Sequence, residues 1–148
     1  MPTKKQELGE YGELVVVKNC SCPKCKRSKT FKRLPTNFKC ADIICDFCGY
    51  LAQVKATNVK NLNKVPKSIL GAAWGPQKER MKAGIYFSLF IVLVNGHSFS
   101  IYYLSADSQT PALFEPRRPL SKKARRAGWQ GFTYNLKQVS KKTIIQLK

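Results

Sequence analysis

The fold of this chain is decided by residues 40–55, which read CADIICDFCGYLAQVK. Apolar residues lie on both sides of a turn made of Cys, Asp, Phe, Cys and Gly, and this pattern predicts a hairpin of two strands, 38–45 and 50–57. The turn carries half of a metal-site motif, Cys45 and Cys48. The same hairpin also carries polar residues on both of its strands, so one short segment combines two kinds of candidate site.

The polar residues of this hairpin can form a second site. Side chains alternate along a strand, so Gln53 and Lys55 point to one face, and Asp42 on the neighbouring strand can point the same way. A carboxylate and an amide oxygen suit Mg²⁺, and a nearby lysine can stabilise negative charge or help to deprotonate a water. This cluster predicts metal-assisted hydrolysis of a phosphodiester. The alternative is a surface hairpin with scattered polar residues.

Four of the six cysteines have the spacing of a zinc site. Two pairs, each with two intervening residues, are separated by 19 residues: Cys22, Cys25, Cys45 and Cys48. Four thiolates close a tetrahedron around Zn²⁺, so we expect a structural zinc site without an open position for catalysis. Cys20 or Cys40 replacing one ligand, and six ordinary buried thiols, stay as alternatives.

Composition limits the class of protein. The 148 residues fit one domain, 1–148, and the 27 basic against 8 acidic residues give a formal charge of +19. That charge favours a polyanion as partner, most simply nucleic acid. No apolar run is long enough to span a bilayer, and no signal peptide is evident. We therefore expect a cytosolic or nucleoid-associated protein without a membrane partner, acting as a monomer or weak dimer, with reduced cysteines.

The remaining chain predicts a mixed α/β fold. The order of helices and strands indicates a mixed central sheet flanked by helices. The expected elements are a helix over 4–18, an exposed loop over 58–68, a helix within 69–83 beginning at Pro76, a hairpin of 85–95 and 98–105, and a last strand over 143–147.

A basic segment near the C-terminus predicts contact with nucleic acid. Its cations can contact phosphates, and an aromatic ring beside them can enter a groove. The candidate residues are Lys122, Lys123, Arg125, Arg126 and Trp129. A core tryptophan beside a solvated run of charge is the alternative.

These motifs together resemble a known family. Cys22-Pro23-x-Cys25, Ala41-Asp42-x-x-Cys45-x-x-Cys48 and Gln53-x-Lys55 are similar to the catalytic domain of the DpnI-type endonucleases, which include the Dam-replacing proteins and belong to the PD-(D/E)xK superfamily. Residues 120–139, with Ala124-Arg125-Arg126-Ala127-Gly128-Trp129 at their centre, resemble a later segment of the same domain. The two blocks cover about 70 residues.

The resemblance implies roles for individual residues. Asp42 takes the place of the metal-binding aspartate, Lys55 that of the catalytic lysine, and the four cysteines those of the zinc ligands. Gln53 stands where the family usually has a second metal-binding acid, which removes one negative charge. Glu10 or Glu13 could supply a helix-borne acid to the magnesium site.

The function implied is a Mg²⁺-dependent restriction endonuclease that cuts duplex DNA at an adenine-methylated, GATC-like site. Because Gln53 departs from the pattern, a nuclease-fold module that binds methylated DNA without cutting is the alternative. A third hypothesis is a zinc-ribbon protein that binds RNA or the ribosome. It explains the charge and the cysteines, but not the arrangement of Asp42 and Lys55 or the segment around Trp129. DpnI-type enzymes continue into a winged-helix domain, and without one we expect specificity to come from this domain alone.

Overall fold

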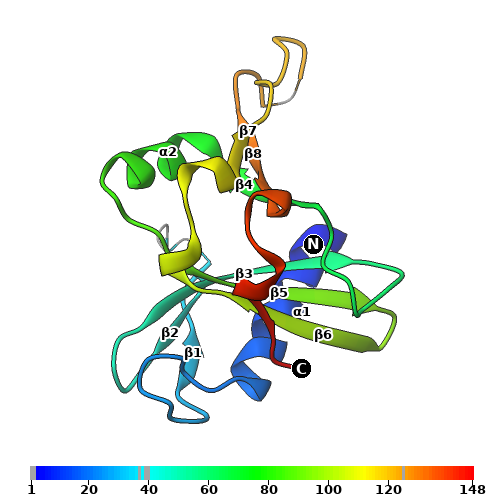
Figure 1. Cartoon of the computed structure of the whole chain (residues 1–148). Helices are drawn as coiled ribbons and strands as arrows, with labels where there is room; N and C mark the ends of the chain where they lie inside the picture. Colours follow the sequence, from blue (N-terminus) through cyan, green and yellow to red (C-terminus); the bar gives the residue numbers. More distant parts are fainter. Residues whose placement is uncertain (1–2, 37, 39–40, 125) are drawn as a thin grey trace.

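The computed structural model describes residues 3–36, 38, 41–124 and 126–148, and within them the fold is mixed α/β (Figure 1). The helices are α1 (Lys4–Asn19) and α2 (Trp74–Lys82). The strands are β1 (Phe31–Arg33), β2 (Ile43–Cys45), β3 (Leu51–Asn58), β4 (Ser68–Ala73), β5 (Ser88–Asn95), β6 (Ser98–Leu104), β7 (Phe114–Pro116), β8 (Gly131–Asn135) and β9 (Ile144–Gln146). Short 3₁₀ turns, η1 to η4, lie at 106–108, 111–113, 136–138 and 141–143.

The central sheet is mixed, as the sequence predicted. Its six strands lie in the order β1-β2-β3-β5-β6-β9. Strands β3 and β5 are parallel, and the other neighbours are antiparallel. The parallel pair requires a crossover, which contains β4 and α2. Residues 88–94 of β5 are all buried, so this strand is covered on both faces, and it begins three residues later than the expected strand 85–95.

Both predicted hairpins are present. Strands β5 and β6 pair across the two-residue turn Gly96-His97. Strands β2 and β3 pair antiparallel, although β2 is shorter than the predicted strand 38–45, of which residues 39 and 40 lie outside the described part of the chain. Gly49 in the connecting turn has φ +80°, a conformation that a side chain disfavours.

Helix α1 covers one face of the central sheet. Thr3 caps its N-terminus, and the side chains of Thr3 and Gln6 bond reciprocally to each other's backbone N–H. Gly12 allows the helix to approach β3 closely, since a Cβ there would lie 2.8 Å from the Cβ of Ala56. The helix expected over 4–18 is confirmed, and it buries Val15 and Val16 while Leu14 is 52% exposed.

The opposite face is covered mainly by a second sheet, of order β4-β8-β7, together with α2 (Figure 1). The expected helix within 69–83 is confirmed as α2, although it begins at Trp74 rather than Pro76, and the residues before it form β4, a strand that the sequence did not predict. Strand β8 pairs with β4 across more than 50 residues of sequence, and this pairing overrides local preference in a stretch of small residues. Among the described residues, no helix is both long and apolar enough to cross a bilayer.

Candidate metal and active sites

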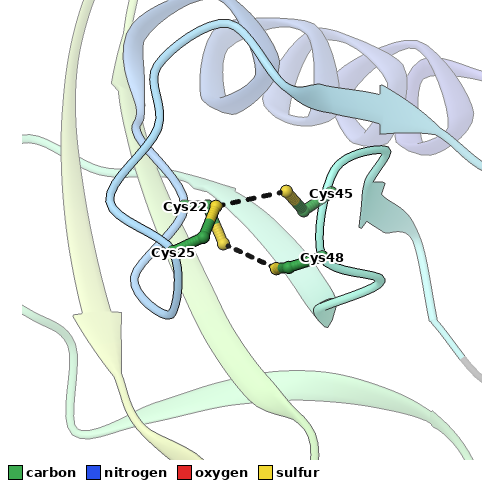
Figure 2. A group of neighbouring side chains, drawn as sticks. All are labelled: Cys22, Cys25, Cys45 and Cys48. Atoms are coloured by element: carbon green, nitrogen blue, oxygen red, sulfur yellow. Dashed lines mark hydrogen bonds between the residues drawn. The ribbon is translucent and has the colours of Figure 1, made fainter.

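The four cysteines of the spaced motif converge on one point. Cys22 and Cys25 approach from the loop after α1, while Cys45 and Cys48 approach from the β2–β3 turn (Figure 2). All four sulfur atoms lie within 4.8 Å of one another. The sulfurs of Cys22 and Cys48 are 3.5 Å apart, and those of Cys25 and Cys45 are 3.7 Å apart.

These distances fit a metal ion. Four sulfurs held 2.3 Å from a central Zn²⁺ would lie about 3.8 Å from one another. Two of the separations, 3.5 and 3.7 Å, are close to this value and the others are within 4.8 Å, so a small adjustment would close a tetrahedral thiolate site. Because all four ligand positions would be filled by cysteines, no position remains open for a substrate or water. Such a set suits a structural rather than a catalytic metal.

The surroundings favour a thiolate at one of the four sulfurs. Burial raises the pKa of the Cys45 thiol, but hydrogen bonds with Thr30 and with the N–H groups of Cys48 and Phe47 outweigh it and lower this pKa to about 6. The Thr30 hydroxyl lies 3.2 Å from the Cys45 sulfur. Burial raises the pKa of Cys22 to about 12, so this thiol would need a metal's charge to ionise.

Of the two remaining cysteines, Cys20 is buried at the end of α1 and is not among the clustered sulfurs. Burial raises its pKa to about 11, which makes it an inert core thiol. Cys40 lies outside the described residues.

At the other end of the same hairpin lies a cleft of about 320 Å³. It opens between the β2–β3 hairpin on one side and β4 with α2 on the other. Its lining residues are Phe38, Ala41, Asp42, Gln53, Lys55, Ala72, Ala73, Pro76 and Arg80. The three polar residues singled out in the hairpin therefore line one cavity.

Asp42 is fixed between the two polar positions of β3. Its backbone N–H donates to the carbonyl of Ala52 at 3.0 Å, and its Oδ2 accepts from the N–H of Val54 at 2.7 Å. Asp42 directly precedes β2, and its two bonds extend the hydrogen bonding between β2 and β3 by one residue. Because Val54 lies between Gln53 and Lys55, the carboxylate is held beside both of them.

Gln53 is held from across the cleft. The hydroxyl of Tyr134 on β8 donates to its Oε1 at 3.1 Å. Tyr134 is 1% exposed. Burial raises the pKa of Tyr134, the negative charge of Asp42 raises it further, and Arg80 opposes both. Tyr134 therefore stays a neutral hydrogen-bond donor, and sequence reasoning did not single it out.

Two cations face this cleft. Burial lowers the pKa of Lys55 from its ordinary 10.5, and Arg80 lowers it further, while the carboxylates of Asp42 and Glu13 oppose the change. Arg80 projects from α2, where it donates to Oε1 of Gln77 at 3.0 Å. Sequence reasoning did not single out Arg80, because it lies 25 residues beyond Lys55 and no local motif connects it with the hairpin.

Of the two helix-borne acids, Glu13 is the one near the cleft. Its Oε1 lies 3.1 Å from Nε of Arg33, and its charge interacts with those of Asp42 and Lys55. Burial is the largest cause of its raised pKa, and Asp42 adds to the increase. Glu10 is exposed, and neither acid lines the cleft itself.

The predicted basic segment forms an arm between β7 and β8 that projects from the body of the molecule (Figure 1). The N–H of Leu120 donates to the carbonyl of Trp129 at 2.8 Å, so the arm is a hairpin. The Arg126 guanidinium stacks on the Trp129 ring, 4.7 Å from its centroid. Lys122, Lys123 and Arg126 are exposed, and Arg125 lies outside the described residues.

The root of the arm lies beside the cleft. Gly131, where β8 begins, pairs with Ala73 of β4, and Ala73 lines the cleft. Trp129 is partly buried, and its ring packs where a side chain at position 131 would lie, since a Cβ there would be 2.9 Å away. The base of the arm therefore adjoins a wall of the cleft.

Comparison with known families gives one result that covers nearly the whole chain. A family model described as the Dam-replacing family, DpnI, matches residues 3–148. No curated protein sequence matches the chain. The family match includes the cysteine cluster, the cleft and the arm, and it suggests a methylation-dependent restriction endonuclease that binds DNA.

Proposed function

Because the chain belongs to the DpnI or Dam-replacing family, we propose that it is a Mg²⁺-dependent endonuclease that hydrolyses duplex DNA at adenine-methylated sites. The observation that carries this proposal is the shared cleft of Asp42, Gln53 and Lys55, with the carboxylate fixed on Val54. A helix, an antiparallel hairpin and a parallel neighbouring strand around this cleft support a nuclease core of the PD-(D/E)xK type.

In this proposal, the residues of the cleft divide the chemistry between them. The Asp42 carboxylate and the Gln53 amide oxygen would hold Mg²⁺, which takes oxygen ligands. When bound, the ion polarises the phosphodiester and offsets charge on the leaving oxygen. Lys55 either stabilises the charge that develops on the phosphate or, when neutral, accepts a proton from the attacking water.

Arg80 and Glu13 would act at the edge of this site. Arg80 lines the cleft and supplies a permanent positive charge to a phosphate oxygen. Glu13 adds negative charge near Asp42 and draws in a cation. Glu10 is exposed and electrostatically coupled to Glu13, so we assign it no direct contact with the metal.

The arm would hold the duplex over the cleft. Lys122, Lys123 and Arg126 are exposed and can contact phosphates, which gives affinity without sequence information. We propose the same role for Arg125. Trp129 lies on the arm near the cleft and can contact an apolar group in a groove, such as a methyl group on adenine.

The cysteine cluster would hold a structural Zn²⁺ that fixes the hairpin turn. Cys45, which lies in the turn, ends the strand that Asp42 precedes. A rigid turn therefore keeps Asp42 in register with the two polar residues of β3.

The test is digestion of one plasmid, prepared with and without adenine methylation, in the presence of Mg²⁺. We expect wild-type protein to cut the methylated DNA and Asp42→Ala to lose at least ~10²-fold in rate, since the metal loses its only charged ligand at the hairpin. Asp107→Ala, a change at an exposed acid outside the cleft, serves as the control and should cut like wild type. Failure of wild type to cut either DNA, or full activity of Asp42→Ala, would refute the proposal.

A second function is favoured by one specific contact. The Gln53 oxygen already accepts a hydrogen bond from Tyr134, and an amide carries no charge to attract a cation. A module that binds methylated DNA without cutting would tolerate both features. Salt-sensitive binding of methylated duplex in Mg²⁺, with the DNA recovered intact, would support this alternative over an enzyme.

A further inference from the structure

A second cleft, larger than the candidate active site, lies away from it. It has a volume of about 500 Å³ and opens between the loop before β4 and the turns after β8. Its floor is apolar and consists of Val65, Pro66, Tyr102, Leu136, Val139 and Ile144. A cleft of this size is within the range of about 300–1,000 Å³ that holds small organic groups.

The rim of this cleft is cationic. Four lysines surround the apolar floor, and all four are exposed: Lys64, Lys67, Lys137 and Lys141. No acidic residue is among the described residues that line it. The ligand that fits an apolar floor inside a ring of positive charge has a flat or apolar part and carries anionic groups.

We propose that this lysine-rimmed cleft binds an unpaired, single-stranded segment of DNA. The bases would lie on the apolar floor, and the phosphates would contact the lysines. A duplex hides the faces of its bases in the stack, so only an unpaired strand can use the floor as well as the rim. The proposal rests on DNA binding, which the family implies, and it does not rest on cleavage.

The position of the cleft supports this occupant. Lys67 of the rim directly precedes β4, whereas Ala72 and Ala73 at the other end of β4 line the candidate active site. Six residues of strand span about 20 Å, which is within reach of a few nucleotides. A single strand could therefore leave the candidate active site and enter the lysine-rimmed cleft on the same side of the central sheet.

The experiment measures binding of full-length protein to a fluorescent octanucleotide without Mg²⁺, so that no cutting occurs. Its comparison ligands are a duplex of the same length, an abasic strand with the same phosphates, and a poly-glutamate peptide. We expect the octanucleotide to bind ~10-fold or more tightly than the abasic strand, since contact with even one base contributes about that factor. Equal binding of octanucleotide and abasic strand, or displacement by the peptide at equal charge concentration, overturns the proposal.

Two matched variants locate the binding. Lys137→Gln/Lys141→Gln should weaken octanucleotide binding and lower the salt slope by about 1.4, because each lost phosphate contact contributes about 0.7. Lys18→Gln/Lys32→Gln removes the same charge from α1 and from β1, at the opposite edge of the central sheet, and should leave the slope unchanged. An equal loss in both variants overturns the proposal.

A third variant tests the floor. Val139→Thr keeps the shape of a half-buried side chain and replaces a methyl group with a hydroxyl, so it should weaken octanucleotide binding without changing the salt slope, with the protein still folded at the temperature of the assay. Unchanged affinity in this variant overturns the role of the floor. Cleavage of methylated plasmid is measured separately, so a failure of this proposal is distinguishable from a failure of the proposed endonuclease.

Discussion

The two ends of the β2–β3 hairpin are assembled in different ways. At the turn, four sulfurs from two short loop segments lie within 4.8 Å of one another, and their set is complete. At the opposite end, Asp42 and β3 face a cleft whose other wall comes from β4 and α2, and Tyr134 reaches it from β8. The hairpin thus has a closed site formed by two short segments at one end and an open site formed by distant elements at the other. The first should control stability, whereas the second should control chemistry.

Loss of the cysteine cluster should have the largest effect. Cys45→Ser removes one of four ligands, and structural zinc contributes folding free energy of roughly 10–16 kcal/mol in small zinc domains. We expect loss of bound zinc and a fall in melting temperature of roughly 10 °C or more, measured by elemental analysis and thermal unfolding. Cys20→Ala, at the buried cysteine outside the cluster, should keep one zinc per chain. Wild-type zinc content and stability in Cys45→Ser would contradict this assignment.

Substitution of Lys55 should separate chemistry from stability. Lys55→Met should reduce cleavage by roughly 10²–10³-fold, because the cleft loses a group that stabilises the developing charge. The matched control is Lys60→Met, at an exposed lysine beyond the end of β3, which should cut normally. Cleavage by Lys55→Met within ~3-fold of wild type would remove Lys55 from the mechanism.

The stability of Lys55→Met should change in the opposite direction. Burial lowers the pKa of Lys55 in the folded protein below its ordinary 10.5, so the folded state resists protonation. This penalty is fully present below the folded pKa and disappears as the pH rises through 10.5. The variant should therefore be more stable than wild type at neutral pH, with the difference shrinking in alkali, as denaturant titrations at several pH values would reveal.

Gln53→Glu should have a smaller effect that distinguishes a cutter from a binder. A carboxylate restores the charge that the family usually places at this position, and Tyr134 can still donate to it. We expect ~10-fold faster cleavage at limiting Mg²⁺ and a lower Mg²⁺ requirement. Gln146→Glu adds the same charge on exposed β9 and should change neither. If Gln53→Glu cuts and wild type does not, the binding module is favoured over the enzyme.

The contrast between the two ends also explains what could be predicted from the sequence. The cysteine spacing and the alternation within residues 40–55 are local patterns, so they predicted the converging sulfurs and the antiparallel pairing, and the first helix was likewise expected from residues 4–18 alone. Strands β4 and β8 were not predicted, because their pairing joins residues far apart in sequence. Arg80 and Tyr134 were missed for the same reason, since each enters the cleft region from an element that no local motif connects to the hairpin.

Tyr134→Phe should have the smallest effect and tests whether the long-range wall positions the cleft. The variant removes the hydroxyl that donates to Gln53 at 3.1 Å, at a cost of about 1 kcal/mol in stability, and frees the amide to rotate. Cleavage should fall a few-fold, mainly through a higher Mg²⁺ requirement. Tyr103→Phe also removes a hydrogen-bonded hydroxyl, one that lies 2.5 Å from that of Tyr50 and outside the cleft. Both variants should lose comparable stability. If the Mg²⁺ requirement rises equally in both, Tyr134 acts through the stability of the core. If it rises only in Tyr134→Phe, the role of the Tyr134 hydroxyl is to position Gln53.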